Sequence, residues 1–368
     1  MHAYWLVFLP AAAYQCLAIV ACLKHLALTH LSGPAATQPV SVLKPLRGLD
    51  PNTREAFISQ FTQDYPQFEI LFGARDAADP AAIEVQRLQG EFPQASIRLI
   101  IGADDAPNAK VGTLAELSRH ARYPLRVIND SDIKVDPQYL SRVTAPLQDP
   151  GIGVVTCLYR VKAHNPPAAW EALGIMTDFM PSTLVAQLIG VREFGLGSTL
   201  AFRAADLEQA GGFAAIADYL ADDYQLAKRI TGLGKRALLS TYVVETSLGD
   251  ATWRGIWLHQ LRWARTIRLT KGAGHLGLPI THAGLWAAIA VSTGAVVPAI
   301  VLLVLRILSA LLSGAFVLHS PFAACFSWLS PLWDLYSFSV WLASYAGKTV
   351  RWRDRTLKVS PDGRIIKD

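Results

Sequence analysis

The chain has 368 residues, of which 52% are hydrophobic and only 17% are charged, and its mean hydropathy is +0.27. Soluble globular chains carry about 25% charged residues, so this composition excludes a purely soluble protein and a disordered one. The net charge of +5 is modest, and the length allows about two domains. The four cysteines are scattered without C-x-x-C spacing, which argues against a zinc site or a disulfide framework.

The N-terminal segment is apolar. Residues 3–23 contain no charge, and their number suffices for one membrane span, which needs about 20 residues. A cleaved signal peptide is the alternative, but no Lys or Arg precedes the apolar run, and Lys24 and His25 follow it. We therefore expect an N-terminal transmembrane anchor over residues 1–30, with the following domain on the cytoplasmic side.

A second apolar block covers residues 283–347 and has room for two or three C-terminal transmembrane helices. The tail that follows, 348–368, is rich in Lys and Arg, which favours the cytoplasm. An even number of crossings places this tail on the same side as the central domain. We therefore expect two spans, near 284–310 and 322–346.

The second block carries only two charges, Arg306 and Asp334. A carboxylate inside a membrane span is costly unless it is paired or faces protein. We expect Asp334 to pair with Arg306 or with a backbone group.

Between the apolar blocks, short apolar runs alternate with segments of helical periodicity. The expected strands are Pro39–Leu43, Phe68–Ala74, Ser96–Ile101, Leu125–Ile128 and Gly153–Leu158, and the first expected helices are Pro51–Gln63 and Ala81–Phe92. This alternation predicts an α/β domain over 31–250, with a mostly parallel sheet covered on both faces. Ligands of such sheets bind at the carboxyl ends of the strands.

Acidic residues follow two of these strands. The strand Leu125–Ile128 leads into Asn129-Asp130-Ser131-Asp132. Two carboxylates so placed suit a hard divalent cation such as Mg²⁺ or Mn²⁺, which can bridge a diphosphate; the alternative is an ordinary polar turn. Asp76, after the second strand, is expected either to accept hydrogen bonds from a base or ribose or to cap the next helix.

Basic residues and a third acidic site accompany these aspartates. Lys44 and Lys110 can each meet a phosphate group or be solvated. Asp222 and Asp223 precede a helical segment and either favour its macrodipole or supply a general base, since repulsion and burial raise the pKa of one of them. The stretch around Gly197, Ser198 and Thr199 is expected to line the mouth of an acceptor site or to form a turn.

The segment Trp253–Lys271 has an apolar and a basic face, and no acidic residue occurs from Ala251 to Trp333. A basic amphipathic helix beside a membrane block is expected in the membrane interface, so we assign 251–282 to interfacial helices. Arg262 is able to turn inward and bind a diphosphate. Nucleic-acid binding is disfavoured because the positive charge is concentrated next to the membrane.

Taken in order, these motifs resemble a known family. The matching stretches are S-V-L-K-P-L-R-G-L-D from Ser41, F-G-A-R-D-A-A-D-P from Phe72, N-D-S-D-I-K-V from Asn129, G-V-V-T-C-L-Y-R from Gly153, L-A-D-D-Y from Leu220 and H-Q-L-R-W from His259. The chain resembles membrane glycosyltransferases of the ceramide glucosyltransferase-like group, glycosyltransferase family 21. Within that group it is most similar to bacterial hopanoid-biosynthesis enzymes.

The resemblance implies a GT-A catalytic domain and a signature of three aspartates followed by (Q/R)-x-x-R-W. The aspartates fall on Asp76, Asp130 and Asp223. The last motif falls on His259, Arg262 and Trp263, but its first position is His, and Gln260 comes one place later. The sequence leaves open which of His259 and Gln260 faces the diphosphate. The full D-S-D with Asp132 favours the hopanoid branch, since animal ceramide enzymes carry glycine at that place.

The expected activity is an inverting, metal-dependent transfer of one sugar from a UDP-sugar to a lipid hydroxyl. Asp76 holds the uridine, Asp130 and Asp132 hold Mg²⁺ or Mn²⁺, and Asp223 is the general base. The first choice of substrates is UDP-N-acetylglucosamine and bacteriohopanetetrol, in the inner membrane of a bacterium. UDP-glucose with ceramide is the alternative, and a processive polysaccharide synthase or a non-catalytic membrane scaffold is the alternative of another class.

Overall fold

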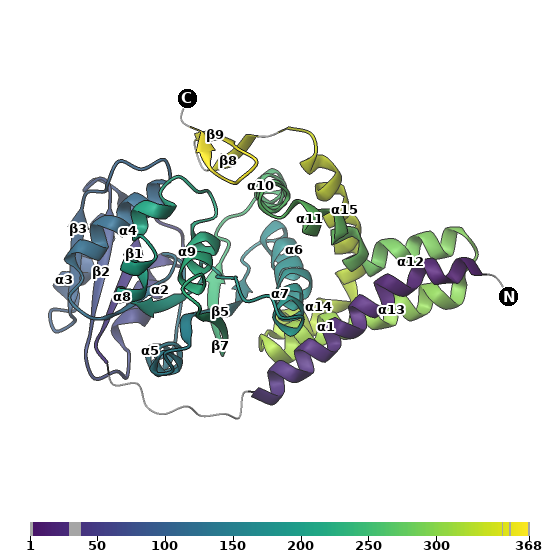
Figure 1. Cartoon of the computed structure of the whole chain (residues 1–368), viewed down its shortest axis with the longest axis horizontal. Helices are drawn as coiled ribbons and strands as arrows, with labels where there is room; N and C mark the ends of the chain where they lie inside the picture. Colours follow the sequence, from purple (N-terminus) through teal and green to yellow (C-terminus); the bar gives the residue numbers. More distant parts are fainter. Residues whose placement is uncertain (1–2, 29–37, 348, 353–354, 367–368) are drawn as a thin grey trace. The chain divides into compact units, whose positions relative to one another are not determined.

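The computed structural model describes residues 3–28, 38–347, 349–352 and 355–366 (Figure 1). Its backbone contacts divide the chain into two compact units. The sheet unit comprises residues 31–159 and 191–249, and the helical unit comprises 1–30, 160–190 and 250–366. Residues 160–190, which the sequence places within the α/β domain, thus group with the terminal helices.

The sheet unit is built on seven strands in the order β3-β2-β1-β4-β6-β5-β7. The strands are β1 (Val40–Pro45), β2 (Phe68–Ala74), β3 (Ile97–Ile101), β4 (Leu125–Ile128), β5 (Ile152–Lys162), β6 (Leu200–Arg203) and β7 (Arg236–Ser247). Strand β1 pairs in parallel with β2 and β4, and β2 pairs in parallel with β3. Strand β6 is antiparallel to both β4 and β5. The predicted mixed, mostly parallel sheet is confirmed, although β6 and β7 were not expected.

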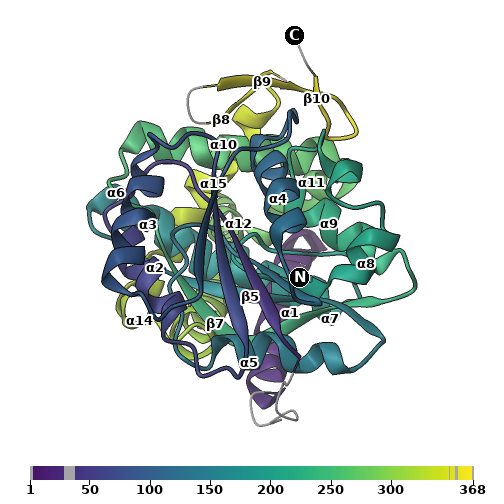
Figure 2. The same cartoon turned by 90° about the vertical axis from the view of Figure 1, so that its left-hand side faces the viewer.

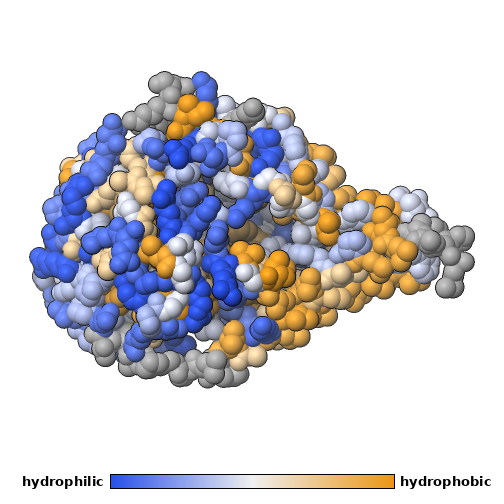
Figure 3. Space-filling view, in the orientation of Figure 1, coloured by the Kyte–Doolittle hydropathy of each residue, from blue (hydrophilic) through white to orange (hydrophobic). Residues whose placement is uncertain are grey.

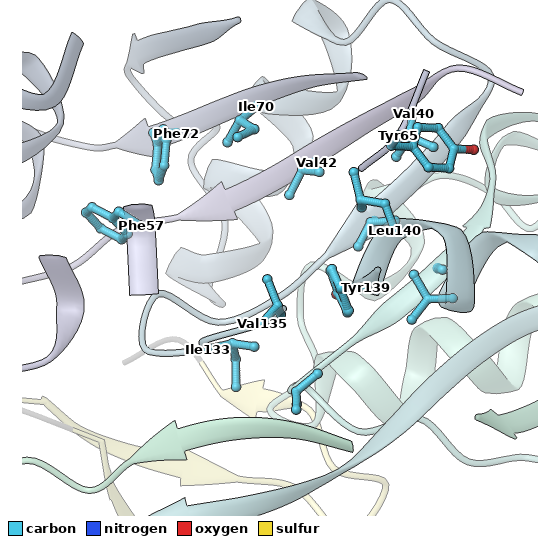
Figure 4. Packing of buried hydrophobic residues seen from close by; sticks show 14 of the residues in the cluster. Val40, Val42, Phe57, Tyr65, Ile70, Phe72, Ile133, Val135, Tyr139 and Leu140 are labelled. Atoms are coloured by element: carbon cyan, nitrogen blue, oxygen red, sulfur yellow. The ribbon is translucent and has the colours of Figure 1, made fainter. Parts of the chain in front are cut away.

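Helices cover both faces of this sheet. Successive residues of a strand point to opposite sides, so each strand contributes side chains to two core clusters. Val42 and Val127 pack in one core cluster with α2 (Thr53–Phe61), α3 (Pro80–Glu91) and α5 (Tyr139–Thr144). Leu43 and Ile128, the next residues along, pack in the other cluster with α4 (Ala109–His120), α8 (Ala204–Gln209) and α9 (Asp222–Thr231). Figure 2 shows the two sets of helices beside the sheet, and Figure 4 shows the first cluster around Phe57 and Phe72.

The helical unit collects segments from both ends of the chain and from its middle. Its helices are α1 (Leu9–Leu28), α6 (Pro166–Gly174), α7 (Met180–Leu188), α10 (Trp253–Thr270), α11 (Gly272–Gly277), α12 (Ala283–Ser292), α13 (Val296–Leu311), α14 (Pro321–Phe326) and α15 (Ser330–Ser344). A small sheet of β8 (Thr349–Trp352), β9 (Arg355–Val359) and β10 (Ile365–Ile366) follows. Of the basic tail, Lys348, Arg353 and Lys367 lie outside the described residues.

Within the described part of the chain, two helices are long and apolar enough to cross a membrane: Trp5–Leu28, with a mean hydropathy of 2.1, and Val296–Val317, with a mean hydropathy of 2.5. Figure 3 shows apolar surface over α1, α12 and α13. Val296, Val297 and Val304 each keep more than half of their area exposed in the isolated chain. Such exposure of large apolar side chains is typical of a surface that contacts another apolar phase.

The expected continuous helix over 284–310 is wrong. The chain reverses at Gly294, whose φ of 75° ends α12. The amide of Ala295 donates to the carbonyl of Ala290, and the amide of Gly294 donates to that of Val291. These two bonds form a Schellman cap, which favours glycine at its left-handed position. The hydropathy of the block hides this turn because the capping residues are small and uncharged.

The pairing expected for Asp334 is confirmed. Its carboxylate accepts from Nε and Nη2 of Arg306 at 2.8–3.0 Å and from the amide of Gly284 at 2.8 Å. The third guanidinium nitrogen of Arg306 donates to the carbonyl of Thr177. Both side chains are almost fully buried, so each charge depends on the other for compensation.

Replacing Asp334 by alanine leaves the Arg306 charge buried without its partner, which costs about 3–5 kcal/mol. We expect Asp334→Ala to lower the melting temperature of the detergent-purified protein by several degrees. Asp362→Ala is the control, because Asp362 forms an exposed pair with Arg364 and such pairs contribute little. Equal melting temperatures of the two variants would contradict the interpretation.

Candidate active site

The acidic segment Asn129-Asp130-Ser131-Asp132 begins where β4 ends. Lys44 at the end of β1 is its neighbour across the parallel pair, because Leu43 is in register with Ile128. Asn129 is fully buried, whereas the side chain of Asp130 keeps 43% of its area exposed. The strand end thus presents Asp130 to solvent at the carboxyl edge of the sheet, where ligands of α/β sheets bind.

Lys110 connects Asp130 to a second acidic site. It lies in the first turn of α4, whose N-cap Asn108 accepts from the amides of Lys110 and Val111. Its Nζ lies 2.8 Å from Oδ1 of Asp130 and 3.2 Å from Oδ2 of Asp222. Burial alone would lower the pKa of Lys110, but the two carboxylates outweigh it and raise that pKa above its ordinary value. Lys110 is therefore a permanent cation between the two acids.

Asp223 lies beside Asp222 in the first turn of α9. Its Oδ2 accepts from the backbone amide of Gly197 at 3.0 Å. Burial, followed by the like charge of Asp222, raises the pKa of Asp223 to about 6, and Lys110 opposes the rise. A carboxylate with this pKa is suited to act as a general base near neutral pH.

Gly197 is the point on which these side chains converge. Because β6 runs antiparallel to β4, with Leu200 in register with Ile128, the loop before β6 passes the end of β4. A Cβ atom added to Gly197 would lie 3.1 Å from Oδ2 of Asp130, 3.5 Å from Oδ2 of Asp223 and 3.6 Å from Nζ of Lys110. The missing side chain lets the backbone of Gly197 approach these three groups closely.

Lys44 is not part of the cluster around Gly197. Its side chain is fully buried, and its Nζ donates to Oδ1 of Asn129 at 2.7 Å and to the carbonyl of Asp130 at 2.8 Å. Burial lowers the pKa of Lys44 to about 7, and Asp132 and Asp130 oppose this effect. This placement indicates that Lys44 holds the Asp130 loop in place. It does not favour the phosphate contact that the sequence suggests.

Ser198 and Thr199 also face inward. The hydroxyl of Ser198 donates to the carbonyl of Cys157 at 2.9 Å, and that of Thr199 donates to the carbonyl of Ser198 at 2.6 Å. Both side chains are buried, because the pairing of β6 between β4 and β5 brings the loop into the core. Their placement gives no support to the acceptor-lining role expected of them, which leaves Gly197 as the part of this loop at the site.

Asp76 follows β2 at the same edge of the sheet and is exposed. Its Oδ1 accepts from the amide of Ala78, and its carbonyl accepts from the amide of Asp79. Asp79, and not Asp76, caps α3. Among the described residues, Asp76 makes no ion pair or hydrogen bond with the Asp130–Asp223 cluster, so its role at a uridine stays a prediction.

The donor set at the end of β4 fits a hard divalent cation. Asp130 and Asp132 supply carboxylate oxygens, and Oδ2 of Asp130 lies beside Gly197. Asp132 is held by the hydroxyl of Thr246, and burial followed by the charge of Asp130 raises its pKa. A positive ion between the two acids would offset this repulsion. The described residues contain no group of three or more His, Cys, Asp or Glu side chains with metal-binding geometry, so a cation here needs ligand or water oxygens as well.

In the helical unit, α10 carries the H-Q-L-R-W motif. Nδ1 of His259 and Nε2 of Gln260 lie 2.6 and 2.7 Å from the same oxygen, Oε1 of Glu171 in α6. The ring of Trp263 packs against that of His259 at 4.8 Å. Both residues that the sequence offers as alternatives therefore contact Glu171, a buried carboxylate that the motif analysis missed. The sequence feature that could have indicated Glu171 is that it is the single acidic residue within the apolar segment Pro166–Gly174.

The sheet topology, with acidic residues gathered at the carboxyl edge, defines a GT-A-type glycosyltransferase fold. A solved structure supports this class: the mannosyltransferase PcManGT from Pyrobaculum calidifontis, in complex with GDP-Man and Mn²⁺, is similar with a TM-score of 0.57. The two chains are 20% identical, and the match covers 92% of this chain and 96% of that one. The chain belongs to Glycosyl transferase family 21, whose sequence profile matches residues 3–365.

Ceramide glucosyltransferases are among its relatives. Ceramide glucosyltransferase 1 of Caenorhabditis elegans is 31% identical over 245 residues, which are 65% of this chain and 52% of the relative. The ceramide glucosyltransferase of Komagataella phaffii is 32% identical over 114 residues, 30% of this chain and 22% of the relative. The chain thus spans about half the length of the first relative and less than a quarter of the second. The expected membership of family 21 is confirmed, and the likeness to hopanoid enzymes stays a prediction.

The close approach of Asp130 to Gly197 can be tested by adding a methyl group there. We expect Gly197→Ala to reduce glycosyl transfer about 10- to 100-fold, because its methyl group would displace the carboxylate of Asp130. Gly90→Ala is the matched control, since the same methyl group meets nothing within 4 Å in α3. The measurement is initial transfer rate at equal amounts of folded protein. Full activity of Gly197→Ala would show that the close contact between Asp130 and Gly197 does not matter for sugar transfer.

Proposed function

We propose that the protein transfers one sugar from a UDP-sugar to the hydroxyl group of a membrane lipid, with inversion at the anomeric carbon. The observation that supports this proposal is the convergence of Asp130, Lys110 and Asp223 around Gly197. The cluster offers a cation and a carboxylate of raised pKa at one place. A glycosyl transfer needs both, one for the leaving diphosphate and one for the proton of the acceptor.

The donor side of the site consists of charges. Asp130 and Asp132 would hold Mg²⁺ or Mn²⁺, and the solved relative PcManGT contains Mn²⁺ with its sugar nucleotide. Bound there, the cation would stabilise the negative charge of the diphosphate. Lys110 adds a fixed positive charge between Asp130 and Asp222. Arg262 of the H-Q-L-R-W motif is proposed to bind the diphosphate, and Asp76 the uridine.

The acceptor side depends on Asp223. Its ionised carboxylate takes the proton of the lipid hydroxyl while that oxygen attacks the anomeric carbon, and the bond from this carbon to the diphosphate oxygen breaks. The amide of Gly197 fixes Oδ2 of Asp223 by a hydrogen bond of 3.0 Å. General-base catalysis of this kind contributes about 10²–10⁴-fold to the rate. Asp222 is proposed to lie near the acceptor and to tune Asp223.

A lipid acceptor requires a membrane-bound enzyme, because each CH₂ that leaves the bilayer costs about 0.8 kcal/mol. The two apolar helices Trp5–Leu28 and Val296–Val317 would supply the attachment, with α10 in the interface and the sheet unit in the cytoplasm of a bacterium. A processive polysaccharide synthase is the alternative, and the size of the product distinguishes it, since our proposal gives a single sugar on each lipid.

Two acceptor classes are supported by different observations. The relatives named ceramide glucosyltransferases favour UDP-glucose and ceramide. The resemblance carried by the complete D-S-D segment with Asp132 favours UDP-N-acetylglucosamine and bacteriohopanetetrol, in hopanoid biosynthesis. The names of the relatives support ceramide more directly, and both pairs are proposals.

The decisive experiment incubates membranes containing the protein with each radiolabelled UDP-sugar and either ceramide or hopanoid lipid. We expect one labelled lipid that depends on added Mg²⁺ or Mn²⁺. Asp223→Asn should reduce its formation by roughly 10²–10⁴-fold while UDP binding persists. Asp218→Asn, an exposed acid on the preceding loop, should be as active as the wild type. Wild-type turnover by Asp223→Asn would exclude Asp223 as the base.

The pKa of Asp223 predicts the pH dependence of the reaction. The base must be ionised, so kcat is expected to rise with pH through about 6 and to be lost below it. Asp222→Asn removes a like charge that raises this pKa, so the acidic limb of the profile should move to lower pH. A limb that does not move in Asp222→Asn would show that another group controls it.

A further inference from the structure

A chain of buried polar side chains starts at Lys44 and passes through Asn129. The ammonium group of Lys44 only donates hydrogen bonds, so its contact of 2.7 Å fixes Oδ1 of Asn129 as the acceptor. The amide nitrogen Nδ2 of Asn129 then donates to the hydroxyl of Tyr139 at 3.2 Å and to Oε1 of Gln60 at 3.4 Å. All four side chains are at most 1% exposed.

The same chain continues to the loop before β6. The hydroxyls of Tyr139 and Thr199 are 3.0 Å apart, and Thr199 donates its proton to the carbonyl of Ser198 at 2.6 Å. Tyr139 must therefore donate to Thr199. Every bond from Lys44 to Ser198 points in the same direction, an arrangement in which hydrogen bonds strengthen one another.

The two ends of this network contact the two backbone segments that position the carboxylates of the site. At one end, Lys44 also donates to the carbonyl of Asp130 at 2.8 Å. At the other end, Thr199 and Ser198 fix the loop whose Gly197 amide binds Oδ2 of Asp223 at 3.0 Å. The segments that carry Asp130 and Gly197 are thus joined through the core of the protein as well as by the pairing of β4 with β6.

The residue types in this hydrogen-bonded network indicate a role beyond stabilising the fold. Burying the charge of Lys44 without a carboxylate in hydrogen-bonding contact is costly, and apolar residues of similar volume would fill the core at lower cost. A side-chain network that is fully satisfied does, however, rigidify the segments that it connects. Rigid supporting contacts are what a catalytic pair separated by a fixed distance requires.

We propose that the Lys44–Asn129–Tyr139–Thr199 chain, the positioning network, sets the distance between Asp130 and Asp223 and thereby the rate of sugar transfer. Its members touch neither donor nor acceptor and act through the two loops. The inference rests on the proposed function, since it assigns the network to the reaction carried out by those two carboxylates.

The test removes one hydroxyl and keeps the shape of the core. Tyr139→Phe interrupts the network at its centre and should lower kcat roughly tenfold, with KM for the UDP-sugar changed less than twofold. Tyr65→Phe is the matched control. The Tyr65 hydroxyl is also buried: it donates to the carbonyl of Gln38 at 2.6 Å and lies 3.2 Å from the hydroxyl of Thr144. Its loss should therefore cost similar stability but leave kcat unchanged.

A second variant reaches the network from its other end. Thr199→Val should lower kcat by a similar factor, and the double variant with Tyr139→Phe should be little worse than either single variant, because both break the same chain. If Tyr139→Phe keeps wild-type kcat, or if Tyr65→Phe loses as much, the network is merely structural and the proposal is wrong. Additive losses would also overturn it.

Amide hydrogen exchange separates failure of this inference from failure of the proposed function. In Tyr139→Phe, exchange should accelerate in both 129–132 and 196–199, whereas Tyr65→Phe should leave both segments unchanged. Accelerated exchange in both segments would support the network even if the wild type transferred no sugar to any lipid tested. Acceleration in one segment alone, or in neither, would refute the connection whatever the activity.

Discussion

The site depends on the compensation of charge at one edge of a sheet. Asp130, Asp222 and Asp223 come from two elements distant in sequence, and folding gathers the three like charges at one place, where burial penalises the ionised form of Asp223. Lys110 makes this arrangement stable, because its ammonium lies within 3.2 Å of two of the three carboxylates. Lys110 does not fully offset the effects of burial and of the neighbouring charge of Asp222, so the pKa of Asp223 stays raised. The same electrostatic cost that opposes folding thus produces a base suited to neutral pH.

The fold determines which side chains share this edge. Parallel pairing of β1 with β4 places Lys44 and Asn129 side by side, and antiparallel pairing of β6 with β4 returns the chain to the same point. Gly197 is the residue at this return, and an added Cβ there would be in tight contact with Asp130 and in van der Waals contact with Asp223. The close approach of the three groups to one backbone position is therefore a consequence of strand order and of one glycine.

The sequence predicted what depends on local pattern. The bounds of β2 and β4 match the expected strands, and α10 begins at the predicted Trp253. It did not predict β6 or the turn at Gly294, because a strand of four residues and a small uncharged cap have no distinctive periodicity. Nor could it show that Lys44, Ser198 and Thr199 face inward, since burial of a polar side chain depends on partners elsewhere in the chain. Lys44 in particular reads as a phosphate contact until its partner, Asn129, is known.

The departure of this chain from the family's (Q/R)-x-x-R-W motif has a structural explanation in Glu171. A carboxylate that is only 2% exposed requires donors, and His259 and Gln260 supply them together. Trp263, one turn further along α10, packs on the ring of His259. These contacts fix the rotation of α10 about its axis within the helical unit, and with it the direction of Arg262 on the same turn. His259 and Gln260 therefore both bind one buried acid, and these contacts hold the H-Q-L-R-W segment in place within the helical unit.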